Sequence, residues 1–352
     1  MTKKIVFFNT NVEWGGGEKW HFTMANLLKD LGIQVHFITA VNSVLLQRAK
    51  DNELHVHPIK SSNLSFLHPS TRKQIKRILS TLNPDAVIFN SPRDLKLGAV
   101  IAKKAGVKKV IYRRGMPHPI KNTFLNRYIY QHIDIIIANS EEIKKQVIKN
   151  IPSLSSKVHI IYNGVEPHEK RMSEIQTPVR LGNLARLVDQ KGHDMLIKVA
   201  KGLKENKFDF KLIIAGTGPN KELIQNWIDE NKLGQHVELV GHQKAEEFFP
   251  QIDMFIFTSL FEGSANALVE SLQYQIPAIT FDISSMSEVV ENNTVGKLIP
   301  PFDCEAMARE IMALASDSKR YQQYQNNCYY KVLMKFDIKE KSMQLLGLIY
   351  DN

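Results

Sequence analysis

The chain has 352 residues, enough for two domains of ordinary size, and its composition of 43% hydrophobic and 23% charged residues is that of a globular protein. This composition excludes a disordered, collagen-like or coiled-coil chain, and no apolar run reaches the ~20 residues that span a bilayer. Two cysteines and no C-x-x-C motif exclude a disulfide framework and fit a reducing compartment.

Short apolar, β-branched runs alternate with amphipathic segments along the whole chain. The runs predict strands over residues 4–9, 34–39, 86–90, 109–112, 133–138 and 158–162, and again over 179–183, 211–215, 237–240, 254–258 and 278–280. Helices are predicted over residues 20–31, 140–150, 195–204 and 306–315. This alternation favours parallel sheets, and the series appears twice with a polar seam over residues 163–177. We therefore predict two doubly wound, Rossmann-like α/β domains facing each other across a cleft, with ligands at the carboxyl ends of the strands.

The basic charge of the chain is concentrated in its first half. Residues 1–165 carry 25 Lys and Arg against 10 Asp and Glu, whereas residues 166–352 carry 21 against 26. Such asymmetry indicates that the first half meets something anionic: nucleic acid, a membrane surface or a phosphorylated substrate. A surface that merely keeps the protein soluble is the alternative.

Glycine-rich loops follow several of the predicted strands. Gly15-Gly16-Gly17 opens the first helix, and Gly216-Thr217-Gly218 follows the strand over residues 211–215. Glycine lets the backbone approach a phosphate, and a helix N-terminus offers N–H groups to it. A phosphate loop and an ordinary flexible turn both fit each of these segments.

Charged residues gather on two further loops of the second half. Arg186 and Lys191 follow the strand over residues 179–183, where two cations suit a diphosphate or simply face solvent. Glu262 precedes a helix expected to begin near Ser264, and Glu270 lies about two turns inside it, so both carboxylates can accept hydrogen bonds from sugar hydroxyls. No Asp-x-Asp motif offers a cage for a metal-bound diphosphate, which leaves cations and a helix N-terminus to neutralise a departing diphosphate.

Taken together, these motifs resemble family 4 of the group 1, retaining, nucleotide-sugar-dependent glycosyltransferases, which have the GT-B fold. The motifs that carry the resemblance are Gly15-Gly16-Gly17-Glu18, Asn163-Gly164-Val165-Glu166, Arg186 with Lys191-Gly192, Gly216-Thr217-Gly218-Pro219, and Glu262 through Glu270. The resemblance implies an acceptor-binding domain over residues 1–165 and a donor-binding domain over 166–331. It also implies a last helix over residues 332–352 that returns to the first domain, and a reaction that needs no metal or other cofactor.

The resemblance also assigns roles to single residues. Arg186 and Lys191 would bind the donor diphosphate and stabilise the leaving nucleotide. Glu262 would lie near the donor sugar hydroxyls, and Glu270 would hold the ribose. The other implied donor contacts are Gly16, Gly17, Gly216, Gly241, His242, Gly263, Ser264, Ala265 and Asn266.

One departure from the family pattern lies in the first half. Many family members carry a histidine after a strand of the first domain, directed at the donor sugar, but here Arg113 and Arg114 stand at that place and His118 follows. Either an arginine meets a charged acceptor, or His118 supplies the sugar contact, or His118 is structural. The departure bears on the identity of the donor rather than on the class of reaction.

Two other classes of protein compete with this interpretation. A sugar-nucleotide epimerase of the same fold needs catalytic acids and bases that the sequence does not identify. A nucleic-acid-binding protein needs basic residues interleaved with aromatics, or a helix-turn-helix, and neither is present. We therefore predict a cytoplasmic glycosyltransferase with a nucleotide-sugar donor, a glycan or lipid-linked acceptor and no nucleic-acid partner. The resemblance places it in cell-surface polysaccharide or lipopolysaccharide biosynthesis.

A helix predicted over residues 68–82 is basic on one side and apolar on the other. Its cations are Arg72, Lys73, Lys76 and Arg77, and its apolar stripe is Ile75, Ile78, Leu79 and Leu82. Such a helix either attaches the protein peripherally to an anionic membrane or packs its stripe on the first sheet and leaves the cations in water.

Overall fold

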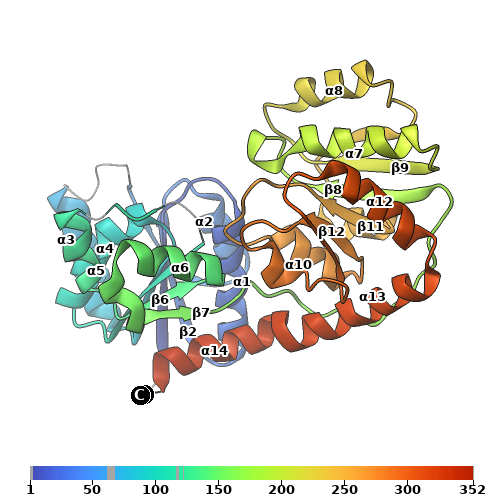
Figure 1. Cartoon of the computed structure of the whole chain (residues 1–352). Helices are drawn as coiled ribbons and strands as arrows, with labels where there is room; N and C mark the ends of the chain where they lie inside the picture. Colours follow the sequence, from blue (N-terminus) through green and yellow to red (C-terminus); the bar gives the residue numbers. More distant parts are fainter. Residues whose placement is uncertain (1–2, 62–67, 116–118, 122, 352) are drawn as a thin grey trace. The chain divides into compact units, whose positions relative to one another are not determined.

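The structure, a computed structural model, describes residues 3–61, 68–115, 119–121 and 123–351. The chain divides into two compact units, of which the first comprises Met1–Asn163 with Lys339–Asn352 and the second comprises Gly164–Ile338. Each unit is built on one parallel β-sheet with flanking helices (Figure 1). The predicted doubly wound α/β class is confirmed. Within the described ranges, no helix is long and apolar enough to cross a membrane.

The first unit has a seven-stranded sheet in the order β3-β2-β1-β4-β5-β6-β7. Its strands are β1 (Lys4–Asn9), β2 (Gln34–Ala40), β3 (His55–Ile59), β4 (Ala86–Phe89), β5 (Lys109–Arg114), β6 (Ile135–Ala138) and β7 (Val158–Ile160). Its helices are α1 (Gly16–Asp30), α2 (Val44–Asp51), α3 (Pro69–Leu82), α4 (Pro92–Lys104), α5 (Phe124–Gln131), α6 (Glu141–Asn150) and the 3-10 turn η2 (Pro152–Lys157). The strand order reverses between β1 and β4, which is where ligands bind in open α/β sheets.

Local sequence decides where four of these helices begin. A serine or threonine stands at each N-cap, and its hydroxyl oxygen accepts a hydrogen bond from a backbone N–H of the first turn. These caps are Ser43 for α2, Ser91 for α4, Thr123 for α5 and Ser140 for α6. The interior strands are buried on both faces, as in β1, where Ile5, Val6, Phe7 and Phe8 are fully buried. Continuous apolar runs in the sequence reflect this two-sided burial.

Helix α3 packs its apolar stripe into the first unit rather than presenting it to the outside. Ile75 and Leu79 are fully buried in the core cluster of the sheet, and Ile78 and Leu82 pack against that cluster half-buried. Of the two expectations for residues 68–82, packing on the first sheet is the one observed for the apolar side chains. The four cations of the helix are exposed.

The second unit has a six-stranded sheet in the order β10-β9-β8-β11-β12-β13. Its strands are β8 (Val179–Leu184), β9 (Phe210–Ala215), β10 (Val237–Gly241), β11 (Met254–Phe257), β12 (Ala278–Phe281) and β13 (Gly296–Ile299). Its helices are α7 (His193–Glu205), α8 (Lys221–Glu230), α9 (Ala245–Phe248), α10 (Asn266–Gln273), α11 (Met286–Val289), α12 (Cys304–Ala315) and α13 (Ser318–Lys331). The 3-10 turns η3 (Asp189–Lys191) and η4 (Phe249–Gln251) and the π-helical segment η5 (Val332–Phe336) complete it.

The last helix, α14 (Ile338–Tyr350), is packed in the first unit. Leu345 and Ile349 are buried there. The Tyr350 hydroxyl lies 3.4 Å from Asp85 Oδ2, and Lys3 Nζ lies 4.2 Å from the centroid of the Tyr350 ring. The first unit therefore contains both described ends of the chain.

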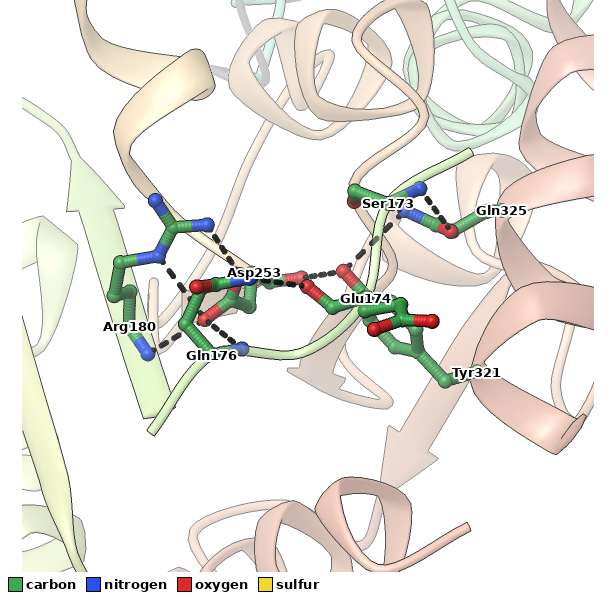
Figure 2. A network of polar contacts seen from close by, with 7 residues as sticks. All are labelled: Ser173, Glu174, Gln176, Arg180, Asp253, Tyr321 and Gln325. Atoms are coloured by element: carbon green, nitrogen blue, oxygen red, sulfur yellow. Dashed lines mark hydrogen bonds and ion pairs between the residues drawn. The ribbon is translucent and has the colours of Figure 1, made fainter. Parts of the chain in front are cut away.

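A polar network closes the amino-terminal edge of the second sheet (Figure 2). Arg180, at the start of β8, donates from Nη2 to Oδ1 of the fully buried Asp253 at 2.6 Å, and from its backbone N–H to Oδ2 at 2.8 Å. Tyr321 of α13 donates from its hydroxyl to the Asp253 carbonyl at 3.0 Å, and Gln325 donates from Nε2 to Ser173 Oγ at 2.8 Å. These bonds fasten the segment before β8 to helix α13 and to the start of β11.

The apolar pattern of the sequence does not predict β3 or β13, each of which is an outer strand of its sheet. Strand β3 has the sequence His-Val-His-Pro-Ile, and β13 begins with Gly296. An outer strand pairs on one side only, so it tolerates proline and polar residues that an interior strand excludes. Their short, mixed sequences lack the continuous apolar run that marks the interior strands.

Candidate functional site

Three loops meet at the carboxyl edge of the second sheet, where the sequence places the donor contacts. The loop after β8 carries Arg186, the loop after β9 carries Gly216, and β10 ends at Gly241. Leu187 donates its backbone N–H to the Thr217 carbonyl at 2.9 Å, and Gly216 donates to the Gly241 carbonyl at 2.7 Å. These bonds fix the three loops beside one another.

Close packing of these loops requires glycine at two positions. A Cβ atom on Gly216, whose φ is 151°, would lie 1.8 Å from the Ala185 carbonyl oxygen. A Cβ atom on Gly218, whose φ is 159°, would lie 2.3 Å from the Leu187 carbonyl oxygen. Contacts of this length collide, so the loop after β9 reaches the loop after β8 only with glycine at both places.

Lys191 and Glu262 form an ion pair at the same edge. Lys191 ends the turn η3 and Glu262 lies on the loop after β11, and the Nζ of the lysine contacts the Oε1 of the glutamate. Both side chains are largely buried, and Lys191 Nζ lies 5.7 Å from the ring centroid of Phe257. The structure thus brings together one residue predicted for the diphosphate and one predicted for the sugar.

Backbone contacts hold the lysine loop against the loop after β11. Thr258 donates from its hydroxyl to the Lys191 carbonyl at 3.2 Å, and Leu260 donates its backbone N–H to the Gln190 carbonyl at 2.8 Å. Gly192 has a φ of 61°, and a Cβ atom there would lie 2.2 Å from the Thr258 carbonyl oxygen. Lys191 therefore needs the glycine after it to reach its place.

Glu262 is fixed from the other side by the loop after β12. The Ser284 hydroxyl donates to the Glu262 carbonyl at 2.7 Å, and the Ser285 hydroxyl donates to the same oxygen at 3.2 Å. Because these bonds hold the backbone and Lys191 holds the carboxylate, the side chain of Glu262 has a defined direction. Such support is what a preorganised binding group requires.

Helix α10 begins at Asn266, two residues later than the sequence predicts. Gly263 and Ala265 are buried and Ser264 is half-buried, while the Ser264 hydroxyl lies 3.2 Å from Asn266 Oδ1. Glu270 is half-buried on the second turn of the helix. This segment follows Glu262 directly in the chain, so the predicted residues from Glu262 to Glu270 lie on one loop and the helix that it opens.

Arg186 and His242 are exposed on the loops after β8 and β10. Among the described residues, Arg186 forms no ion pair, whereas Lys191 is paired with Glu262. Throughout the residues that the structure describes, no group of three or more His, Cys, Asp or Glu side chains is arranged to hold a metal ion. A cavity of about 510 Å³, lined in part by Ile175, Phe208 and Met312, lies at the opposite, amino-terminal edge of the sheet and contains none of the predicted site residues.

A lysine at the site affects the titration of a buried histidine. His193, the first residue of α7, is buried, and neither of its ring nitrogens has a hydrogen-bond partner among the described residues. Burial, and secondarily the charge of Lys191, lowers the pKa of His193 to about 4, with Asp194 opposing the shift. His193 is therefore neutral at pH 7.

The first unit has a different arrangement at its carboxyl edge, built on amides. Glu18, in the first turn of α1, is buried, and its Oε1 accepts hydrogen bonds from Asn11 at 2.7 Å, Asn9 at 3.1 Å and Asn90 at 3.3 Å. Asn9 ends β1 and Asn90 follows β4, so the two strands at the switch point each contribute one amide. The sequence pattern gives Glu18 no role beyond its place in the glycine motif.

Arg113 is an interior residue of this network rather than a surface cation. Its Nη1 donates to Asn90 Oδ1 at 3.1 Å, its Nη2 donates to Asn163 Oδ1 at 2.9 Å, and its guanidinium carbon lies 4.9 Å from the centroid of the Trp20 ring. Burial lowers the pKa of Arg113 to about 10, and the charge of Glu18 opposes that shift. The guanidinium therefore remains charged at pH 7.

The other residues predicted for this edge are placed as follows. Arg114 is buried, with its Nη1 lying 3.4 Å from the Tyr112 hydroxyl oxygen. Gly16 begins α1. A Cβ atom on Gly17 would lie 2.2 Å from Asn90 Nδ2, so the Asn90 amide fits beside α1 only because residue 17 has no side chain. His118 lies outside the described residues.

Comparison with known proteins decides the family. Residues 14–169 match the family model described as Glycosyltransferase Family 4, and residues 165–330 match the one described as Glycosyl transferases group 1. The chain belongs to the group 1, family 4 glycosyltransferases. It is accordingly a glycosyltransferase of a retaining, nucleotide-sugar-dependent family, and the predicted family and enzyme class are confirmed.

Similar proteins span almost the whole glycosyltransferase chain. An N-acetylgalactosamine-N,N'-diacetylbacillosaminyl-diphospho-undecaprenol 4-alpha-N-acetylgalactosaminyltransferase of Campylobacter jejuni is 25% identical and covers 92% of this chain and 93% of its own. The capsular polysaccharide biosynthesis glycosyltransferase CapM of Staphylococcus aureus is 24% identical over 88% and 87%. Anabaena Alr3699/HepE, solved in complex with UDP, superimposes with a TM-score of 0.86 at 16% identity, covering 99% of this chain and 100% of its own. The architecture is the GT-B fold.

Proposed function

We propose that the protein transfers a sugar from a nucleoside diphosphate donor to a glycan or lipid-linked acceptor in the assembly of a cell-surface polysaccharide or lipopolysaccharide. The observation that carries the proposal is the buried pair of Lys191 and Glu262 at the carboxyl edge of the second sheet. An ammonium and a carboxylate held there by loops from three strands suit the two parts of such a donor, its diphosphate and its sugar. UDP is the proposed nucleotide, because the Anabaena neighbour was solved in complex with it.

Lys191 and Arg186 are the proposed diphosphate contacts. A lysine ammonium has three N–H donors, so Lys191 can keep its bond to Glu262 while it donates to a phosphate oxygen. Arg186 is exposed at the same edge, where a planar guanidinium can bind two phosphate oxygens at once. Positive charge fixed beside the diphosphate stabilises the negative charge that develops as the nucleotide leaves.

Glu262 and Glu270 are the proposed hydroxyl contacts. The Oε1 of Glu262 is engaged by Lys191, which leaves its other oxygen to accept from a sugar hydroxyl, and Glu270 would accept from the ribose. Gly263, Ser264, Ala265 and Asn266 would border the donor at the start of α10. Gly216, Gly241 and His242 would border the nucleotide, and Gly16 and Gly17 stay proposed donor contacts.

The proposed reaction needs no nucleophile from the chain. The acceptor oxygen forms a bond to the anomeric carbon on the face from which the phosphate oxygen departs, so the configuration is retained. The bond between the anomeric carbon and that phosphate oxygen breaks, and the acceptor hydroxyl proton passes to the departing phosphate. The role of the protein residues is to hold the donor and to stabilise the leaving charge.

The first unit is proposed to bind the acceptor. Arg113 and Arg114 are buried, so they would attract a negatively charged acceptor through their electric field and not by direct contact. Asn90 and Asn163, which Arg113 holds in place, would form hydrogen bonds with the acceptor. His118 stays a proposed contact to the donor sugar or the acceptor. A lipid-linked acceptor is supported by the name of the Campylobacter relative, and such an acceptor would lie in a membrane, of which the cytoplasmic side is the proposed one.

Donor binding tests the proposal directly. Thermal unfolding of the full chain is followed with a series of nucleoside diphosphate sugars, with the matching nucleoside monophosphates as controls. A donor present at 100 times its dissociation constant stabilises the folded state by about 2.7 kcal/mol, which raises the unfolding temperature measurably. The active donor is then incubated with a lipid-linked acceptor and the product identified by mass. A chain stabilised by none of the donors overturns the proposal.

A further inference from the structure

Four neighbouring helices of the first unit form a basic outer surface. Side chains of α3, α4, α5 and α6 share one core with the sheet, and α4 packs between α3 and α5 (Figure 1). The exposed cations of these helices, all of whose residues the structure describes, are Arg72, Lys73, Lys76, Arg77, Lys96, Lys104, Arg127, Lys145 and Lys149. The exposed carboxylate of the same helices is Glu141. We call this the basic surface.

The distribution of charge elsewhere in the first unit is different. Helices α1 and α2 mix exposed bases with exposed acids, as at Lys29 and Asp30 and at Lys50 and Asp51. Solubility alone gives no reason for bases to accumulate on one set of helices, because charges of mixed sign serve it equally well. The basic surface is therefore suited to an extended anionic partner.

An exposed apolar group stands on α5 within this surface. Phe124 is 87% exposed, Leu125 is 48% exposed, and Tyr128, one turn after Phe124, is also exposed. The helix also buries Ile129 and Tyr130 in the core, so the exposed apolar side chains are additional to those that the core uses. We call Phe124, Leu125 and Tyr128 the α5 tip.

Two exposed cations lie close to the α5 tip in the chain. Arg127 is exposed on the helix itself, and Lys121 is exposed just before it. Asn126 donates from Nδ2 to the Lys121 carbonyl at 2.6 Å, which keeps Lys121 close to the helix. Aromatic and aliphatic side chains surrounded by Lys and Arg are typical of segments that lie in the headgroup region of a bilayer.

From these observations we infer that the basic surface binds an anionic lipid bilayer, with the α5 tip inserted between the headgroups. Binding of a nucleic acid backbone would not explain the exposed phenylalanine and leucine. A second copy of this surface would be repelled by the first, because both carry positive charge. The inference deepens the proposed action on a lipid-linked acceptor. The apolar part of the attachment is placed on α5, since the stripe of α3 is occupied by the core.

Vesicle co-sedimentation of the full chain tests the inference in the absence of any sugar donor. Vesicles of phosphatidylglycerol mixed with phosphatidylcholine should bind the protein, and this binding should weaken at high salt; pure phosphatidylcholine vesicles should not bind it. Replacing Arg72, Lys73, Lys76 and Arg77 with Gln should weaken binding roughly 100-fold or more, at about fivefold for each cation. The matched control neutralises Lys201, Lys221, Lys232 and Lys319, which are exposed on the second unit, and should bind nearly as the parent does.

The α5 tip is tested separately. The double change Phe124→Ala and Leu125→Ala should weaken binding to anionic vesicles about tenfold at high salt, where apolar contact dominates. Its control is Leu223→Ala with Met334→Ala, two second-unit side chains of 43% and 84% exposure that match the pair on α5. Equal binding to neutral and anionic vesicles, equal losses in test and control variants, or a change in oligomeric state caused by the α5 variant would each overturn the inference. Donor-induced stabilisation is a separate measurement, so these outcomes leave the proposed glycosyl transfer standing.

Discussion

In the second unit the ammonium of Lys191 contacts the carboxylate of Glu262 directly, whereas in the first unit the amide of Asn90 stands between Glu18 and Arg113. Asn90 donates to the carboxylate and accepts from the guanidinium, so both charges are satisfied without touching. A direct pair can exchange partners when an anionic ligand arrives, because the ammonium has N–H groups to spare. In a pair linked through an amide, three side chains fix the geometry. Such a pair is suited to a structural role at the carboxyl edge of the first sheet.

Each of the two sites also has a neutral histidine beside its cation. His193 lies near Lys191, and His21 lies near Arg113, fully buried between Phe7 and Trp20. Burial comes first and the nearby cation second in lowering the pKa of both histidines. Both units therefore place a cation beside an uncharged imidazole. They differ in the carboxylate, which contacts the cation directly in the second unit and through the Asn90 amide in the first.

The largest expected effect comes from removing the carboxylate of the direct pair. Glu262→Ala should lower turnover by roughly 10²–10³ or more with little change in the far-ultraviolet circular dichroism, because it removes a preorganised contact in the donor site. Glu291→Ala is the matched control, since it breaks another Lys–Glu pair of the second unit, the exposed one with Lys331 at 2.7 Å. Near-normal turnover in the Glu262 variant contradicts the site assignment.

The two cations of the donor site are tested as a pair. Arg186→Ala and Lys191→Ala should each lower turnover by roughly 10²–10³, since each removes positive charge from the departing diphosphate. If both bind that diphosphate, the double variant should lose less than the product of the single losses. Turnover is measured at saturating donor for the parent, the two single variants and the double variant. Strictly multiplicative losses would show that the two cations act on different groups.

Breaking the amide link should destabilise the first unit rather than abolish chemistry outright. Asn90→Leu removes hydrogen bonds to two buried charged groups, and at about 1.5 kcal/mol for each bond the free energy of unfolding should fall by about 3 kcal/mol. Urea denaturation measures this loss. Asn52→Leu, at an exposed amide of the same unit, should change stability by less than about 0.5 kcal/mol. Equal stability of the two variants would mean that Asn90 does not link the charges in solution.

The smallest expected effect at pH 7 is that of replacing His193, which contributes a pH dependence seen only in acid. Its folded pKa of about 4 lies below the unfolded value of 6.5, so the unfolded chain binds the proton first and stability falls as the pH drops from about 6.5 to about 4. His193→Met should reduce that slope by up to about 1.4 kcal/mol per pH unit and leave stability near pH 7 almost unchanged. Denaturation curves recorded at several pH values across this range give the free energy of unfolding as a function of pH. If this free energy changes equally with pH in parent and variant, His193 is not a neutral, buried imidazole.

Interior strands could be predicted from the sequence, whereas β3 and β13 could not, for a physical reason. Strand β1 is covered on both faces, so its sequence is a continuous apolar run, whereas β3 has one open side and accommodates His55, His57 and Pro58. Helix α3 illustrates the same limit. Its apolar stripe fits a core or a membrane equally well, and only the position of the sheet assigns Ile75 and Leu79 to the core.

The candidate donor site was predictable in its residue types and not in its contacts. Motif order indicates Lys191 and Glu262, but they lie 71 positions apart, and their contact depends on the loops after β8 and β11 meeting at one edge. The burial of Arg113 depends on Trp20 and Asn163, which come from distant segments. Glu18 left a usable signal in the sequence, an acid in the first turn of a helix with asparagines, Asn9 and Asn90, at the ends of apolar runs.

Helix α14 makes the second unit an insertion within the first. The polypeptide passes from the first unit to the second between Asn163 and Gly164 and returns between Ile338 and Lys339. During synthesis on a ribosome, all of residues 164–338 therefore emerge before the first unit receives its last helix, with Leu345 and Ile349 that complete its packing. The second unit can therefore finish folding before the first unit, whose apolar surface under α14 stays uncovered until this last helix has been synthesised.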